Sequence, residues 1–379
     1  MQGRDNGAPP SAPASVFPMT QLSEPDRLDA DRMNAFARRM AESLNGAGVS
    51  LMASLGHQTG LFDAMAALPP STSARIAEAA GLHERYVREW LAAMTTAGVV
   101  VFDAAADTYW LPPEHAASLT RASGPHNLAL LAQYVGLMAS VEEPVAACFR
   151  RGSGVSYTAI PRFQKIQAEI SAARVDGTLL DDVLPLVPGL VDRLSAGISA
   201  ADVGCGRGHA LNVMARAFPR SRFFGFDLSR DAIAAARQEA ETMRLSNVRY
   251  DARDASTFNA VKEFELVTAF DAVHVQPQPA RLLRAIAAAL RPGGVFLMAE
   301  PAASTRLEEN LDHPLGSLLY ALSVMHGMTV SLAAGGEGLG TMWGEQKARA
   351  MLAQAGFKNV VVERIDRDAT NQYFIATSC

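Results

Sequence analysis

The sequence has few cysteines, no surplus of positive charge and no long apolar run. Its 379 residues contain three cysteines, Cys148, Cys205 and Cys379, whose spacing suits neither a metal site nor a disulfide scaffold, so we expect a reducing cytoplasm. The net charge of −5 argues against a surface that binds nucleic acid. No uninterrupted stretch reaches the roughly 20 apolar residues of a membrane helix, so no membrane partner is expected.

Hydrophobic residues, by contrast, make up 49% of the chain and charged residues 19%, which indicates a globular protein. At about 150 residues per domain the length predicts two or three domains. Residues 1–28 are polar and rich in proline, so we expect a disordered leader and no signal peptide. The remaining chain divides by pattern into a helical part at 29–120, linker helices at 121–180 and an α/β part at 181–379 with an insertion at 301–345.

The first of these parts has the pattern of a winged helix. A helix is expected over 31–66, then a short helix around Ile76, a turn at Gly81 and a second helix over 83–96. Two short apolar segments at 99–102 and 109–111 predict the wing. Residues 26–120 hold more acidic than basic side chains, so their charge argues against DNA binding.

The C-terminal part alternates strands with helices, which predicts a mostly parallel, Rossmann-like α/β sheet of seven strands. The expected strands are 198–203, 222–226, 248–251, 266–270, 295–299, 360–363 and 373–377. The glycine-rich loop Asp202-Val-Gly204-Cys-Gly206-Arg-Gly208 follows the first strand, and its glycines let the backbone approach a ligand. Such a loop also serves dinucleotides. Asp227 ends the next strand, where a carboxylate can hold both ribose hydroxyls, and Asp254 can accept a hydrogen bond from adenine.

With Leu290-Arg-Pro-Gly-Gly294, these motifs resemble those of class I S-adenosylmethionine-dependent methyltransferases. The winged-helix front and the stretches GLHERYVREWL and GLGTMWGEQ resemble a group of actinobacterial small-molecule methyltransferases. The resemblance implies S-adenosylmethionine as cofactor, a homodimer formed through the N-terminal domain and linker helices that close over the site. It implies that Asp227 binds ribose, Asp254 binds adenine and the Gly204–Gly206 backbone binds the methionine part. It also places at the cofactor Asp202, Cys205, Leu228, Ala255, Phe270, Phe163 and Ser171.

Two further stretches partly match the family's O-methyltransferases. Phe163 and Ser171 match a pattern on the helix that closes over the cofactor, where Gln167 and Glu169 either face the substrate or form a solvated stripe. His274 lies just beyond the fourth expected strand, where the family has a catalytic histidine, but Val-Gln follows it instead of Asp-Trp. A neutral imidazole there can take a proton from a hydroxyl, or it only bonds backbone.

The predicted function is methyl transfer to oxygen or carbon of a small, largely apolar metabolite, within specialised metabolism. One alternative is a prenyl diphosphate C-methyltransferase with Glu169 as base and Mg²⁺ on the diphosphate; otherwise no metal is expected. An alternative of another class is a DNA-binding regulator that senses S-adenosylmethionine. Further candidates for contact with the substrate are Arg150, Arg151, Glu300, His313, Tyr320, His326 and Trp343.

Overall fold

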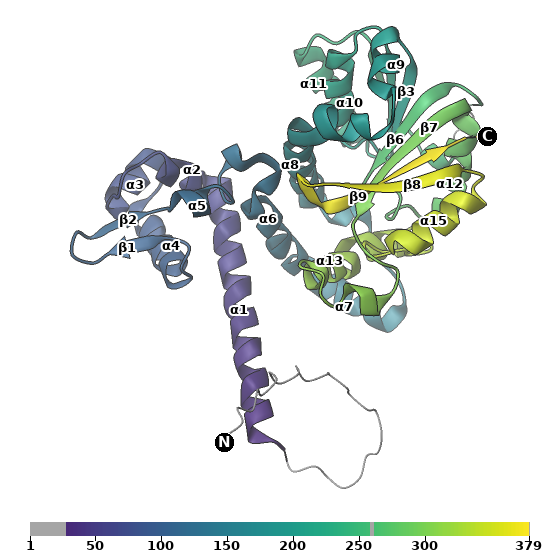
Figure 1. Cartoon of the computed structure of the whole chain (residues 1–379). Coiled ribbons are helices and arrows are strands. Elements are labelled where there is room, and N and C mark those ends of the chain that lie inside the picture. The colour runs from purple at the N-terminus through teal and green to yellow at the C-terminus, as the bar shows by residue number, and fades with distance from the viewer. Residues whose placement is uncertain (1–27, 258–260, 379) are drawn as a thin grey trace, which may run out of the picture. The chain divides into compact units, whose positions relative to one another are not determined.

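The computed structural model describes residues 28–257 and 261–378 (Figure 1). The predicted leader therefore lies outside the described residues, apart from Leu28. The chain divides into two compact parts, with the boundary between Gly46 and Ala47. Helix α1 (Ala30–Thr59) begins in the first part and ends in the second. Gly60, at a φ of 75°, then starts helix α2 (Leu61–Ala66), so the single helix expected over 31–66 is in fact two.

The predicted winged helix is confirmed. Helices α3 (Ser73–Ala80) and α4 (Glu84–Thr96) precede an antiparallel pair of strands, β1 (Val101–Asp103) and β2 (Thr108–Trp110). The side chain of Thr72 caps the start of α3. The rings of Phe62 and Trp90 meet edge to face in its core, with centroids 5.2 Å apart.

The predicted Rossmann-like sheet is also confirmed, with the strand order β5-β4-β3-β6-β7-β9-β8. The strands from β5 to β7 in this order run parallel, and β9 is antiparallel to both its neighbours. The strand order reverses at β3 and β6, so their carboxyl ends border a crevice in which parallel sheets bind ligands. The strands are β3 (Ser199–Val203), β4 (Arg222–Asp227), β5 (Val248–Ala252), β6 (Phe264–Phe270), β7 (Leu290–Pro301), β8 (Lys358–Ile365) and β9 (Asp368–Thr377).

Helices cover both faces of this sheet (Figure 1). One hydrophobic cluster packs α9 (Leu190–Ala196), α10 (His209–Ala217) and α11 (Arg230–Thr242) against the sheet. A second cluster packs α12 (Pro279–Ala289) and α15 (Gly344–Gln354) against the strands. All five residues of β3 are buried, as expected of a strand in the middle of a covered sheet.

The segments before the sheet and the insertion after β7 form a third layer around the crevice. Side chains of α6, α7 and α8 share a hydrophobic cluster with Leu322 and Val330 of the insertion. The helices of these segments are α5 (Pro113–Ala116), α6 (Leu128–Ala139), α7 (Glu142–Arg151), α8 (Pro161–Thr178), α13 (Gly316–Leu322) and α14 (Met328–Ala333). Short 3₁₀ turns lie at Arg121–His126, Tyr157–Ala159, Leu184–Leu186, Ala255–Thr257 and Leu307–Asn310, and π-helical turns at Leu179–Val183 and Ser323–Gly327.

One helical window of the described residues, Gly316–Ala333, is long and apolar enough to cross a membrane. It is broken by the π-helical turn between α13 and α14, and 39% of it is buried within the protein. Several of its apolar side chains line the cavity described next. The apolar character of this window is therefore explained by its place in the wall of a cavity.

Candidate functional site

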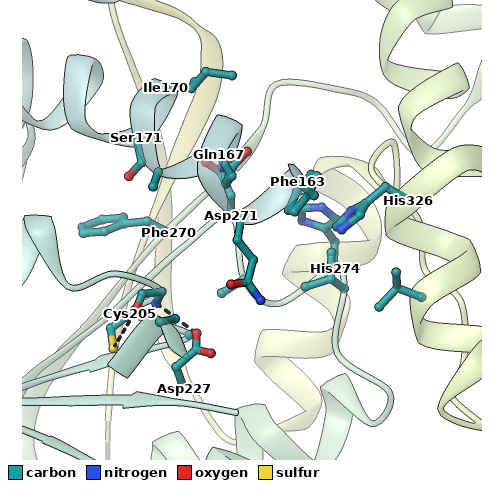
Figure 2. Close-up of a pocket in the computed structure, with 18 of the residues that line it drawn as sticks. Phe163, Gln167, Ile170, Ser171, Cys205, Asp227, Phe270, Asp271, His274 and His326 are labelled. Carbon is teal, nitrogen blue, oxygen red and sulfur yellow. Dashed lines mark hydrogen bonds between the residues drawn. The ribbon is translucent and has the colours of Figure 1, made fainter. Parts of the chain in front are cut away.

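A cavity of about 520 Å³ opens at the carboxyl ends of the parallel strands (Figure 2). Its floor is formed by the loops that follow β3, β4 and β6, and α8 covers it. The broken helix α13–α14 forms an apolar wall, together with Leu131 of α6. The cavity therefore has a polar end at the sheet and an apolar end at the insertion.

The glycine-rich loop is shaped by close contacts that exclude side chains. A Cβ built on Gly204 would lie 2.5 Å from Cβ of Ala272, and one on Gly208 would lie 2.6 Å from Cβ of Ala236. Both glycines also adopt positive φ angles. The loop can therefore pass close to the strand end and leave its backbone facing the cavity.

Two carboxylates flank this loop. Asp227 lines the cavity and is held by backbone: its Oδ2 accepts from the N–H of Gly206 at 2.9 Å, and its Oδ1 accepts from the N–H of Ser229 at 2.8 Å. Asp202 is buried, and Thr268 Oγ1 donates to it at 2.7 Å. Burial raises the pKa of Asp202 to about 7.

Most of the predicted cofactor residues line this one cavity: Asp202, Gly204, Cys205, Gly206, Asp227, Leu228, Ala255, Phe270, Phe163 and Ser171. Asp254 does not. Its Oδ1 accepts from the N–H of Ser256 at 2.8 Å at the start of a 3₁₀ turn, while Arg253 and Ala255 on either side do line the cavity.

His274 lines the cavity just after β6 and is fixed by Glu300 at the end of β7. Nδ1 of His274 lies 2.5 Å from Oε2 of Glu300, which also accepts from Nε1 of Trp343 at 3.1 Å; Oε1 accepts from the N–H of Val273 at 3.0 Å. Burial lowers the pKa of His274, but the charge of Glu300 and this hydrogen bond outweigh it, and the pKa is raised. Because a carboxylate can only accept here, Nδ1 carries the proton and Nε2 is left as a base.

Glu300 and Trp343 were predicted to contact the substrate, but they lie behind His274 and not in the cavity wall. His326 and Gln167 do line the cavity. The ring of His326 stacks on Phe163 with centroids 3.4 Å apart, and Gln167 accepts a short hydrogen bond from the hydroxyl of Tyr134.

Glu169 does not reach the cavity, contrary to its predicted role as a base. Oε1 of Glu169 lies 2.7 Å from Nε2 of His57, and Nε2 of Gln133 donates to Oε2 at 3.1 Å. The side chain therefore points toward the end of α1, on the opposite side of α8 from Ser171, which lines the cavity. Two residues along an α-helix correspond to a rotation of about 200°, so the two side chains point in nearly opposite directions.

Four other predicted substrate residues also lie elsewhere. Arg150 and Arg151 end α7 and are exposed, so they form a solvated face. His313 bonds backbone, with Nε2 2.9 Å from the carbonyl oxygen of Ala302, and Tyr320 accepts from Nδ2 of Asn310 at 3.2 Å. Among residues 28–257 and 261–378, no group of three or more His, Cys, Asp or Glu side chains is arranged to hold a metal ion.

The cavity wall also contains an ion pair that the sequence analysis does not predict. Nη2 of Arg174 on α8 donates to Oδ2 of Asp271 at 2.7 Å, and Nδ2 of Asn371 donates to Oδ1 at 3.0 Å; all three residues line the cavity. Asp271 adopts a positive φ of 53°, which is uncommon for residues other than glycine, although asparagine and aspartate adopt it more often than most. Its place directly after β6 was the only sign in the sequence, since strand ends of this type carry ligand contacts.

His209, which opens α10, ties the covering helix to the sheet domain. Its Nδ1 lies 2.6 Å from Oε1 of Glu239 on α11, and its Nε2 lies 2.9 Å from Oδ1 of Asp176 on α8. The hydrogen bond to Glu239 raises the pKa of His209 to about 9. Near neutral pH the imidazolium therefore bridges two carboxylates and holds α8 over the cavity.

Two family models match the chain. Residues 47–121 match an Rv2258c-like winged HTH domain, and residues 194–340 match a methyltransferase domain. The second match contains the glycine-rich loop, Asp227, His274 and His326.

Curated relatives match part of the chain. A fatty-acid O-methyltransferase of Mycolicibacterium smegmatis is 34% identical over 96 residues, which cover 25% of this chain and 34% of the relative. A trans-aconitate 2-methyltransferase of Methylobacterium nodulans is 28% identical over 153 residues, which cover 40% of this chain and 53% of the relative. The chain thus spans between about a third and a half of the length of these relatives.

Solved structures match nearly the whole fold. A putative O-methyltransferase of Nostoc punctiforme has a TM-score of 0.69 and 17% identity, over 90% of this chain and 98% of its own. Human N-acetylserotonin methyltransferase, solved with S-adenosylmethionine, has a TM-score of 0.66 and 19% identity, over 90% of this chain and 97% of its own. At these identities the likeness concerns the fold.

Proposed function

We propose that the chain is a class I S-adenosylmethionine-dependent methyltransferase with an N-terminal winged-helix domain, and that it methylates a hydroxyl group of a small, largely apolar metabolite. The observation that carries the proposal is the buried pair of His274 and Glu300, of which His274 lines the same cavity as the proposed cofactor residues. A base next to a methyl donor is what oxygen methylation requires. We propose that the protein acts in specialised metabolism and in the cytoplasm.

The residues of the cavity fit S-adenosylmethionine. The carboxylate of Asp227 is oriented to accept from the two ribose hydroxyls, and Leu228, Arg253 and Ala255 lie beside it for the adenine. Arg174 and Asp271 offer opposite charges to the carboxylate and ammonium of the methionine part. This ion pair lies close to the glycine-rich loop: Gly204 packs directly on Ala272, the neighbour of Asp271.

When bound, S-adenosylmethionine would supply a methyl group from its sulfonium, and the leaving group would be a neutral thioether. His274 Nε2 accepts the proton of the substrate hydroxyl as the oxygen–methyl bond forms, and Glu300 stabilises the resulting imidazolium. The apolar wall of α13–α14 excludes water from the reaction. The residues that cover the cavity align donor and acceptor, which lowers the entropic part of the barrier.

The two alternatives find less support. A prenyl diphosphate C-methyltransferase would need Glu169, Arg150 and Arg151 at the cavity, and these side chains lie outside it. A DNA-binding regulator would need unpaired cations on α4, but Arg85 pairs with Glu89 at 2.6 Å and the other arginine of that helix also pairs with a glutamate.

Isothermal calorimetry tests the assignment directly. The purified chain is expected to bind S-adenosylhomocysteine and not NAD⁺, because the charged pair of Arg174 and Asp271 suits the amino-acid part of the first ligand, which NAD⁺ lacks. Tight binding of NAD⁺ with no binding of S-adenosylhomocysteine would overturn the proposed function.

We also propose that the chain has three parts, at 29–120, 121–180 and 181–379. We propose further that it is a homodimer formed through the N-terminal domain. Apolar side chains spaced by three, four or seven residues along α1 are exposed to solvent. A second copy of this helix would bury them. They are Met33, Phe36, Met40, Leu44, Leu51 and Leu55.

Light scattering at micromolar concentration is expected to give the mass of a dimer. Leu44→Asp places a charge in the apolar stripe and should yield a monomer, whereas Ala35→Asp, on the opposite side of the same helix, should leave the dimer intact. A wild-type monomer, or equal behaviour of the two variants, would contradict this interface.

A further inference from the structure

The acceptor end of the cavity contains a second histidine that the proposed reaction does not use. His326 lies in the π-helical turn Ser323–Gly327, which interrupts the helical wall. Single π-helical turns of this kind are frequent at functional sites. A Cβ built on Gly327 would lie 3.4 Å from Cδ2 of His274, so the turn packs directly on the ring of the proposed base. Both imidazoles therefore serve the same end of the cavity (Figure 2).

The side chain of His326 has an unmet hydrogen-bonding capacity. The residue is only 4% exposed, and its Nε2 has no hydrogen-bond partner among the described residues. Buried polar atoms in native proteins almost always have a partner. The stacked ring of Phe163 and the edge of Tyr157 contact the imidazole but offer no such partner. A ligand in the cavity is the remaining source.

The charge of this imidazole restricts what that ligand can be. Burial lowers the pKa of His326 to about 3, and the nearby charge of His274 acts in the same direction. A neutral imidazole gives no charge attraction to a carboxylate or a phosphate. The arginines that line the cavity, Arg174, Arg207 and Arg253, lie on α8, in the glycine-rich loop and after β5, with the proposed cofactor residues. The acceptor end is therefore suited to an uncharged group.

We propose, on the basis of the function proposed above, that the neutral imidazole of His326 hydrogen-bonds a second hydroxyl group of the methyl acceptor, close to the one that His274 deprotonates. A hydroxyl suits both tautomers of His326, because it can donate to one ring nitrogen or accept from the other. The apolar wall and the aromatic side chains Tyr157 and Phe163 suit the flat face of a ring. The acceptor class that follows is an uncharged aromatic with neighbouring hydroxyls. His326 is then a specificity residue, and His274 remains the base.

The test is calorimetric and needs no turnover. The complex of the chain with S-adenosylhomocysteine is titrated with catechol, phenol and benzoate, which differ in the second hydroxyl and in charge. We expect catechol to bind roughly three- to tenfold more tightly than phenol, as one neutral hydrogen bond allows, and benzoate to bind most weakly. His326→Phe keeps a ring to stack on Phe163 but removes both nitrogens, so catechol should fall to the affinity of phenol. His326→Asn keeps a polar amide and should restore part of the difference.

The outcomes are separable from those of the proposed function. Binding of S-adenosylhomocysteine and the melting temperature should be the same for His326→Phe and the wild type, which shows that the variant is folded. Equal binding of catechol and phenol by the wild type, no binding of any of the three, or equal losses for both in His326→Phe would overturn the role of His326. Failure to bind S-adenosylhomocysteine would instead overturn the proposed function itself.

Discussion

Replacing His274 with alanine is expected to lower the rate of methyl transfer by roughly 10²- to 10⁴-fold, the usual contribution of a general base. The affinity for S-adenosylhomocysteine should stay close to that of the wild type, because His274 lies at the acceptor end of the cavity. Single-turnover rates, measured at saturating cofactor and acceptor, separate this loss from effects on binding.

Glu169→Gln is the matched variant, because it also removes one ionisable side chain, here from α8, the helix that covers the cavity. Its carboxylate is bound to His57 and Gln133 outside the cavity, so the rate should change little. A reversed order, with Glu169→Gln the slower variant, would favour a carbon acceptor. If neither variant is slow while the cofactor still binds, the base is another residue.

The pH dependence of the rate should show how the Glu300 carboxylate affects the pKa of His274. His274 acts as a base only when it is neutral, and its pKa is raised above 6.5, so the rate should rise with pH through a value above 6.5. Glu300→Gln removes the charge that raises the pKa and leaves burial, which lowers it. The rise should therefore move to lower pH, and the maximal rate should fall because the base is weaker. An unchanged profile would contradict the coupling of these two residues.

Replacing Asp227 with alanine is expected to weaken the binding of S-adenosylhomocysteine by roughly 10²-fold or more. The change removes a carboxylate that is placed to accept from both ribose hydroxyls, and each charge-assisted hydrogen bond contributes about 1.5–3 kcal/mol. It also removes the acceptor for the N–H of Gly206, which helps to fix the glycine-rich loop. Calorimetry gives the affinity, and the melting temperature checks that the variant is folded.

Asp254→Ala is the control for this experiment. Its carboxylate caps the short turn that begins at Ala255 and is not part of the cavity wall, so the loss of affinity should be much smaller than for Asp227→Ala. 5′-Methylthioadenosine keeps the ribose and lacks the amino-acid part, so Asp227→Ala should weaken it as strongly. Wild-type affinity of Asp227→Ala for both ligands would show that the ribose lies elsewhere.

The sequence by itself determined the sheet and the position of the cofactor residues. Seven apolar segments with helices between them leave few arrangements other than a covered, mostly parallel sheet. The loop from Asp202 to Gly208 and the carboxylate of Asp227 follow consecutive strands, and parallel strands bring such ends to one edge. These motifs are local in the sequence, and the strands that they follow are close to one another along the chain. For the same reason, the sequence alone predicts that His274, which follows the fourth of these strands, lies at the same edge of the sheet.

Only the tertiary structure decided which polar side chains act together. Glu300 is 26 residues from His274 and Trp343 is 43 residues from Glu300, and their contacts arise because β7 lies beside β6 and the insertion returns behind both. Glu169 and Ser171 are two residues apart on α8, yet one contacts the end of α1 and the other faces the cavity. The orientation of a polar residue on a helix that is covered on several sides depends on what packs against each side, and a polar sequence pattern does not contain that information.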